Sequence, residues 1–301
     1  MKSFSFKKLD AFAAGASGGN PAGMISVASF ADISPAEMQR IAMELRGLVN
    51  EVGFVCRTGP DRLALRYYSA EREVLFCGHA TIAILYELMA GNDDLRQLPA
   101  VRFDTANSSL IAENRIREEQ AVFISSPAPT SSSQVPGTAG IAAALGSSPE
   151  AISDTLPTAV INAGLQTLLV PMAGLHATLA VRPDEAVLKS YCEQASLDIV
   201  TLFTGDTARP DSGWRSRVFA PRFGYLEDPA TGSGNAALGH YLLQQRLWHG
   251  EILSIEQNGD RHRPNIVKLL AKADGTVEPR VFIGGSAVCR IEGRYLLQGQ
   301  D

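Results

Sequence analysis

The sequence predicts a mixed α/β fold built from two similar lobes, and three observations support this prediction. The chain has 301 residues, which at roughly 150 residues per domain corresponds to about two domains. Its 27 glycines and 16 prolines are spread along the chain and punctuate many short elements. Two nearly all-apolar segments, one in each half, predict two buried helices at comparable positions.

The first half predicts strands that alternate with two helices. The first helix begins with Ser34 as its N-cap, has Pro35 at its first position and a capping box completed by Glu37, and ends near Gly47. The second, at 79–90, is apolar nearly all round and is therefore expected to be buried. The predicted strands lie at 4–12, 23–27, 52–57, 62–68, 101–105, 108–113 and 121–125.

The second half begins after a loop-like stretch at 127–140, which is rich in Pro, Ser and Gly and marks the expected boundary between the lobes. Helices are predicted at 139–145 and 184–194, with the second buried helix at 233–247. The predicted strands lie at 158–161, 166–170, 177–181, 199–203, 214–219, 252–257, 265–271, 280–284 and 287–291. Aligning 77–84 with 231–238 places Gly78 on Gly232, which suggests an internal duplication.

Composition and charge exclude several classes of protein. Hydrophobic residues make up 45% of the chain and charged residues 20%, which excludes a disordered chain. The apolar runs are far shorter than the roughly 18 residues of a membrane-spanning helix. The first residues contain no apolar signal-peptide region, so we expect a cytoplasmic protein. A net charge of −5 without a basic run argues against nucleic acid, but permits an anionic ligand held by backbone N–H groups.

The cysteines and histidines give little support to a metal site. The four cysteines form no Cys-x-x-Cys pair, and the five histidines form no His-x-x-x-His pair. We therefore expect no metal ion and four reduced cysteines. Only Cys77 has neighbours that suggest chemistry.

Two kinds of candidate site follow from residue chemistry. The helices that begin at Gly78 and Gly232 present unpaired N–H groups, which can bind a carboxylate or stabilise an enolate; alternatively, these glycines only make turns into core helices. Glu51 stands in an otherwise apolar strand entry, where burial would raise its pKa toward the range of a general acid or base. The alternative is a solvated carboxylate at a strand edge.

Four motifs together resemble the PhzF family of phenazine-biosynthesis-like isomerases, over a range from about Asp10 to Gly285. The run Asp-Pro-Ala-Thr-Gly-Ser is the most specific of these motifs, and Glu256-Gln257 is similar to the same family. The four motifs are Gly18-Gly19-Asn20-Pro21-Ala22, Asn50-Glu51-Val52-Gly53-Phe54-Val55, Phe76-Cys77-Gly78-His79-Ala80-Thr81 and Glu227-Asp228-Pro229-Ala230-Thr231-Gly232-Ser233.

The resemblance implies a diaminopimelate-epimerase-like fold, in which two pseudo-symmetric lobes each wrap a curved, mostly antiparallel sheet around a central helix. The N-terminal lobe would comprise 1–126 with about 287–301, and the C-terminal lobe 127–286, with the active site in the cleft between them. It also implies a homodimer that needs no cofactor and acts on a small, carboxylate-bearing anionic substrate. We expect neither nucleic acid nor membrane as a partner.

The resemblance assigns catalytic roles to Glu51, His79, Asp228 and Ser233. Val52 departs from the pattern, because many family members have Thr or Ser after the catalytic Glu. The expected substrate-binding residues, which include the two helix starts, are Asn20, Gly78, Ala80, Thr231, Gly232 and Gly234.

The sequence favours one proton-transfer mechanism over another. Epimerases of this fold use one thiol from each lobe, but here the counterpart of Cys77 is Thr231, whose hydroxyl is a poor base. We therefore expect Glu51 to act as a single base that shifts a double bond by moving a proton. An epimerase with Cys77 or Asp228 as the second base, and an inactive metabolite-binding protein, remain the alternatives.

Overall fold

The computed structural model describes residues 1–273 and 279–299, and its chain separates into two compact units. The first unit comprises Met1–Ala13, Gly18–Ser125 and Gly284–Asp301, and the second comprises Ala14–Ser17 and Ser126–Ile283. The lobes expected from the sequence, 1–126 with about 287–301 and 127–286, differ from these units at 14–17 and near the boundaries. Residues 274–278 and 300–301 of those lobes lie outside the described residues.

The first unit contains a mixed sheet with the strand order β18–β1–β2–β3–β4–β6–β7–β8, and β5 pairs with β4. The pairs β2–β3 and β4–β6 are parallel and the others antiparallel. The strands are β1 (Lys2–Ala11), β2 (Asn20–Ser26), β3 (Glu51–Arg57), β4 (Arg62–Ser69), β5 (Glu73–Val74), β6 (Ala100–Asp104), β7 (Ser109–Arg115), β8 (Ala121–Ser125) and β18 (Ala287–Leu297).

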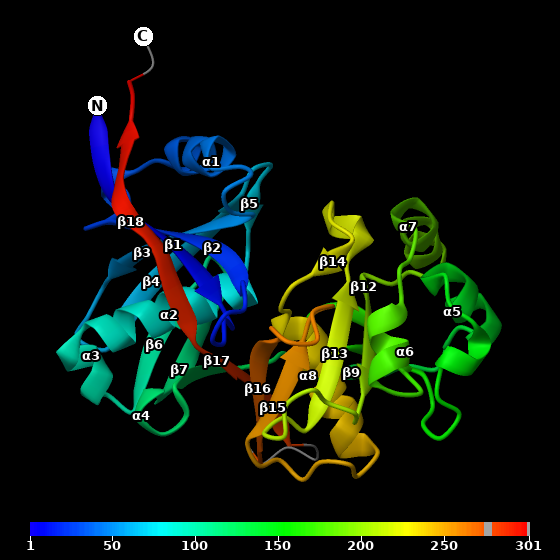
Figure 1. The fold of residues 1–301 in the computed structure, drawn as a ribbon. Helices are drawn as coiled ribbons and strands as arrows, with labels where there is room; N and C mark the ends of the chain where they lie inside the picture. The colour runs from blue at the N-terminus through cyan, green and yellow to red at the C-terminus, as the bar shows by residue number, and fades with distance from the viewer. Residues whose placement is uncertain (274–278, 300–301) are drawn as a thin grey trace. The chain divides into compact units, whose positions relative to one another are not determined.

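The central helix of the first unit is α2 (Gly78–Gly91), which contacts β1, β2, β3, β8 and β18 (Figure 1). Ile82, Ile84 and Leu85 on this helix are fully buried, in agreement with the all-round apolar pattern. The remaining helices of this unit are the short η1 (Phe30–Asp32), α1 (Pro35–Glu44), α3 (Asp93–Gln97) and α4 (Ile116–Glu119).

The second unit has the strand order β9–β10–β11–β12–β13–β15–β16, and β14 pairs with β13. Here β11–β12 and β13–β15 are the parallel pairs. The strands are β9 (Thr130–Ser132), β10 (Ala159–Asn162), β11 (Gln166–Pro171), β12 (Ile199–Thr204), β13 (Trp214–Phe219), β14 (Glu227–Asp228), β15 (Leu253–Gln257) and β16 (Asn265–Lys272), followed by β17 (Arg280–Gly285) at the unit boundary.

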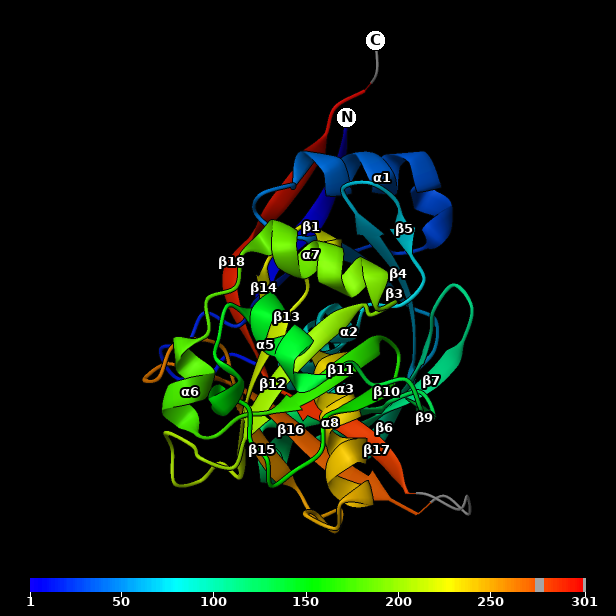
Figure 2. The ribbon, with the colours of Figure 1, turned by 90° about the vertical axis from the view of Figure 1, so that its right-hand side faces the viewer.

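The central helix of the second unit is α8 (Gly232–Gln244), which contacts β10, β11, β12 and β16 (Figure 2). Its residues from Gly234 to Leu242 are all buried. The other helices of this unit are α5 (Thr138–Leu145), η2 (Pro149–Ala151), α6 (Leu175–Ala180), α7 (Glu185–Gln194) and η3 (Pro221–Phe223).

The two units repeat one pairing pattern. The strands from β1 to β7 pair in the same order as the strands from β10 to β16. The parallel pairs also stand at the same two places in both units. A buried helix follows the short β5 in one unit and the short β14 in the other. Even an ion pair recurs, since Arg66 binds Glu73 between β4 and β5, and Arg217 binds Glu227 between β13 and β14. This repetition confirms the two pseudo-symmetric halves that the sequence predicts.

Helix α1 begins as its local signals predict and ends earlier than expected. The Ser34 hydroxyl accepts a hydrogen bond from the Glu37 N–H, and the Glu37 carboxylate accepts one from the Ser34 N–H, so the capping box is present. The helix ends at Glu44 with Leu45 as its C-cap, and Gly47 stands two residues further on with a φ of 87°. Glycine therefore allows the turn after the helix rather than ending it.

The strand predicted at 177–181 is wrong, because Leu175–Ala180 forms helix α6. Leu175 and Thr178, three residues apart, are its buried positions, and the Thr178 hydroxyl donates to the carbonyl of Gly174. The guanidinium of Arg217 binds the carbonyls of Thr178 and Val181 at the end of this helix. A short apolar run is compatible with either structure, and this tertiary contact favours the helix.

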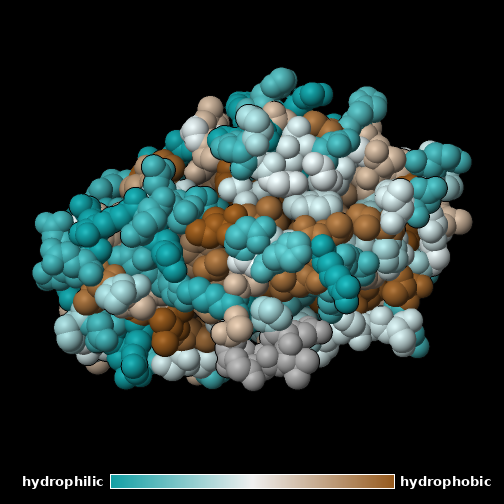
Figure 3. Space-filling model, turned by 90° about the horizontal axis from the view of Figure 1, so that it is seen from below, coloured by the Kyte–Doolittle hydropathy of each residue, from teal (hydrophilic) through white to brown (hydrophobic). Residues whose placement is uncertain are grey.

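Among the described residues, no helix combines the length and apolar character needed to cross a lipid bilayer. On the face seen in Figure 3, hydrophilic side chains cover much of the surface and hydrophobic areas lie between them.

Candidate active site

Glu51 is the first residue of β3, where the strand leaves the apolar core. The five residues after it are buried, whereas the Glu51 side chain is 21% exposed. Burial raises the pKa of Glu51 from its ordinary value of 4.5 to about 7. The carboxyl group can therefore both take up and release a proton near neutral pH.

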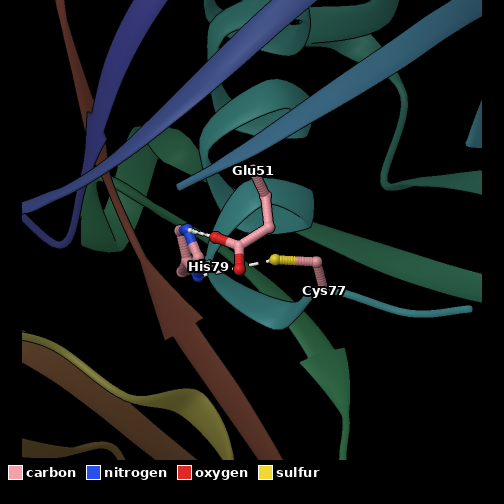
Figure 4. A group of neighbouring side chains, drawn as sticks. All are labelled: Glu51, Cys77 and His79. Carbon is pink, nitrogen blue, oxygen red and sulfur yellow. Dashed lines mark hydrogen bonds and ion pairs between the residues drawn. The ribbon is translucent and has the colours of Figure 1, made fainter. Parts of the chain in front are cut away.

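Cys77 and His79 stand at the start of α2 and face Glu51 (Figure 4). His79 Nε2 lies 3.4 Å from Glu51 Oε2, and Cys77 Sγ lies 3.5 Å from His79 Nδ1. Cys77 is 8% exposed, and the His79 side chain 14%. The structure thus brings together a carboxyl group, an imidazole and a thiol, three groups that can all carry a proton.

The same three side chains have donor atoms that suit a metal ion. A carboxylate oxygen, the thiol sulfur and an imidazole nitrogen all lie within 4.8 Å of one another. The expected absence of a metal therefore stays a prediction.

In the second unit, Asp228 lies in a buried network of hydrogen bonds. The Thr231 hydroxyl donates to Asp228 Oδ2 over 2.5 Å. The Gln257 side chain accepts from the Thr231 N–H over 2.8 Å and donates to the Asp228 carbonyl over 2.9 Å. Asn235 donates to Gln257 Oε1 over 2.6 Å. The structure thereby adds Gln257 and Asn235 to the surroundings of Asp228, and Glu256-Gln257 was the sequence signal for the first of them.

Both central helices begin without a cap from the side chain at their N-cap position. Within the described residues, neither Cys77 nor Thr231 caps its helix through its side chain, whereas Ser34 and Asp184 cap α1 and α7. The positive end of each helix dipole is thus not neutralised by a capping oxygen from these two residues. Such helix starts are suited to an anion such as a carboxylate.

The remaining predicted residues occupy these helix starts and one strand end. Ser233 is the second residue of α8 and is partly exposed, while Gly78 and Gly232 begin the two helices. Asn20 is the first residue of β2 and is 2% exposed. Their roles in binding stay predictions.

Ala80 and Gly234 are buried, and the N–H of Thr231 already bonds to Gln257. Because Gly234 has no side chain and Ala80 only a methyl group, any hydrogen bond from either residue to a substrate would come from the backbone.

Comparisons with known proteins agree with this architecture. The family model for phenazine biosynthesis-like proteins (PhzC-PhzF) matches residues 9–293. The chain is 31% identical over 295 residues to the trans-2,3-dihydro-3-hydroxyanthranilate isomerase of Pseudomonas fluorescens, and the match covers 96% of this chain and 98% of that protein.

Solved structures show the same fold. The structure of a Bacillus anthracis phenazine biosynthesis protein of the PhzF family matches with a TM-score of 0.85 at 24% identity, and covers 99% of this chain and 100% of that chain. A hydroxyproline epimerase from Agrobacterium vitis matches with a TM-score of 0.60 at 12% identity, over 98% of this chain and 91% of that chain. The fold is thus shared with epimerases, as the sequence predicts. The chain belongs to the PhzF family of phenazine-biosynthesis-like proteins, and it is an isomerase.

Proposed function

We propose that this isomerase moves a proton between two carbons of a small, carboxylate-bearing substrate, with Glu51 as the general acid and base. The observation that carries the proposal is the position of Glu51, which burial gives a pKa of about 7 and which lies 3.4 Å from His79. A carboxyl group with that pKa is close to the optimum for proton transfer at neutral pH.

The reaction would run in two proton transfers. Ionised Glu51 removes a proton from a carbon next to an unsaturated group, so the C–H electron pair enters the conjugated system and an O–H bond forms on Glu51. The protonated Glu51 then returns the proton to a second carbon, and the double bond shifts. Because nothing is oxidised or reduced overall, this mechanism requires no redox cofactor, and the helix N-terminus would stabilise the developing negative charge.

The other predicted residues would bind the substrate and stabilise the negative charge that develops. The N-terminal turn of α2 would face the developing charge, and His79 would position a polar substrate group beside Glu51. In this proposal the polar side chains of Asp228 and Ser233 form hydrogen bonds to the substrate.

The helix starts and the relatives support one class of substrate. A helix N-terminus favours a carboxylate, because its first N–H groups and the helix dipole attract negative charge. The Pseudomonas fluorescens relative is named for trans-2,3-dihydro-3-hydroxyanthranilate, which is a carboxylate on an unsaturated ring. We therefore propose unsaturated cyclic acids, or amino acids, as the substrates of this chain.

The test is proton exchange in D2O, read by NMR, with trans-2,3-dihydro-3-hydroxyanthranilate and related cyclic dienoic and amino acids. Glu51→Gln keeps the shape but cannot accept the proton, so we expect exchange to fall by about 10²- to 10⁴-fold. Glu71→Gln makes the same change at an exposed position and should leave exchange unaltered. Full exchange by Glu51→Gln would overturn the single-base mechanism.

A second candidate is an epimerase in which Cys77 supplies the second acid or base. The observation that favours it is the Cys77 thiol, whose Sγ lies 3.5 Å from His79 Nδ1, a nitrogen that can accept its proton. Under this mechanism Cys77→Ser should abolish epimerisation and leave exchange by Glu51 in place. If the single-base mechanism holds, no stereocentre of the substrate is inverted in the product. Cys77→Ser then keeps turnover within about threefold of the wild type.

A further inference from the structure

We propose that Gln257 and Thr231 are positioning residues for Asp228. Together they allow one hydrogen-bond pattern, in which the Thr231 hydroxyl donates to the Asp228 carboxylate and holds it in a fixed orientation. The inference rests on the proposed function, because it assumes that Asp228 contacts the substrate.

The orientation of the Gln257 side-chain amide follows from its neighbours. Oε1 lies 2.8 Å from the backbone N–H of Thr231, which can only donate a hydrogen bond. Nε2 lies 2.9 Å from the carbonyl of Asp228, which can only accept one. An amide turned the other way would place donor against donor and acceptor against acceptor.

Asn235 supports the same orientation from the first turn of α8. Its Nδ2 donates to the carbonyl of Thr231 over 2.9 Å, so this nitrogen is the amide NH2 group, and it also donates to Gln257 Oε1 over 2.6 Å. Its Oδ1 accepts from the hydroxyl of Ser216 over 3.1 Å. Gln257 Oε1 therefore faces two donors.

The fixed amide determines the direction of the Thr231 hydroxyl. Gln257 Nε2 also lies 3.0 Å from Thr231 Oγ1 and donates to it. The hydroxyl proton of Thr231 is then directed at Asp228 Oδ2, 2.5 Å away. Asp228 Oδ2 accepts this bond, which fixes the rotamer of the Asp228 side chain.

Burial makes this pattern rigid. Gln257, Asn235 and Ser216 are fully buried, so water does not compete for these bonds. Gln257 bridges the carbonyl of Asp228 and the N–H of Thr231, and thus spans the turn that joins β14 to α8. Asn265 holds the same turn through the carbonyl of Pro229.

Glu256, the residue before Gln257 on β15, has a different role. Glu256 accepts hydrogen bonds from the N–H groups of Ala208 and Arg209 and forms a fully buried ion pair with Arg215. Because successive strand residues point to opposite faces, Glu256 stabilises a loop while Gln257 acts on Asp228.

The test compares Thr231→Val, which keeps the shape and removes the hydroxyl, with Thr231→Ser, which restores the hydroxyl. We expect kcat to fall at least tenfold in Thr231→Val with KM within threefold of the wild type, and kcat to recover to within threefold in Thr231→Ser. The matched control is Thr178→Val, which removes another buried hydroxyl of this unit, bonded to Gly174, and should leave kcat unchanged. Unfolding transitions confirm that each variant is folded at the assay temperature.

A double-mutant cycle measures the same bond without activity. The double variant should change the unfolding equilibrium constant by at least fivefold less than the product of the separate effects of Thr231→Val and Asp228→Ala, because either change alone already removes the bond. Multiplicative effects in this cycle, or an unchanged kcat in Thr231→Val, would overturn the positioning role. A wild type that exchanges no substrate proton, combined with a coupled cycle, would instead reject the proposed function alone.

Discussion

At the scale of single residues, the repeat does not extend to the proposed chemistry. Tyr67 pairs with Val74 and Val218 pairs with Asp228, so these two pairs occupy equivalent places in the two units. Gly53 pairs with Tyr67, and Thr201 pairs with Val218. Glu51 lies two residues before Gly53, and Ile199 lies two residues before Thr201, so Ile199 is the counterpart of Glu51. The first unit therefore supplies the candidate base, and the second supplies Asp228 where the first has Val74.

Glu51 should make the stability of the protein depend on pH. Its pKa of about 7 lies above the ordinary value of 4.5, so the folded state binds the proton more tightly than the unfolded state. The resulting stabilisation is fully present below pH 4.5 and is lost as the pH rises through about 7, by up to about 3 kcal/mol. Urea unfolding at pH 4.5 and pH 8 measures it.

Glu51→Gln is the control for this prediction, because it cannot ionise. The free energy of unfolding of Glu51→Gln, minus that of the wild type, should rise from pH 4.5 to pH 8. The same difference between the two proteins at both pH values would show that the Glu51 carboxyl titrates normally.

At the scale of elements, local signals and tertiary contacts determine different parts of the fold. Both central helices have a polar residue that bonds back to the N-cap carbonyl, from the Thr81 hydroxyl to Cys77 and from the Asn235 amide to Thr231. The start of α1 was predictable because its capping box is local in sequence. Helix α6 was not, because the contact of Arg217 with its last carbonyls comes from a strand far along the chain.

Gly285 in β17 provides a test of packing at this scale. A Cβ atom there would lie 2.4 Å from the ring of Phe12, which is fully buried. We expect Gly285→Ala to lower the free energy of unfolding by about 1–3 kcal/mol through overpacking. Gly293→Ala in β18 places a Cβ in open space and should change the free energy of unfolding by less than about 0.5 kcal/mol. Urea denaturation of both variants measures this, and equal effects would show that Phe12 can move aside.

At the scale of the whole molecule, the two units should respond to acid in opposite ways. His240 on α8 is 2% exposed, and burial lowers its pKa from 6.5 to about 4. Its contribution to the stability of the second unit is fully present above pH 6.5 and is lost as the pH falls through about 4. Glu51 in the first unit has the opposite dependence between pH 4.5 and about 7.

Hydrogen exchange read by mass spectrometry at pH 5 and pH 7 tests this difference. After correction for the intrinsic exchange rate, protection in the second unit should fall at pH 5 relative to the first unit. His240→Asn should abolish that change in the second unit, while Glu51→Gln should leave it. Parallel changes in both units of the wild type would contradict the prediction and indicate that the chain opens as one unit.

By itself, the sequence determined the α/β class, the two repeated halves, most of the elements and the family, because helix caps, apolar periodicity and short motifs are local properties. It also singled out Glu51, His79, Asp228 and Ser233. Only the tertiary structure decided that Glu51 and His79 meet at the start of α2 beside Cys77, and that Gln257 lies against Asp228 and Thr231. These contacts join residues on different strands and helices, and their geometry depends on strand register and burial, which local sequence patterns do not reveal.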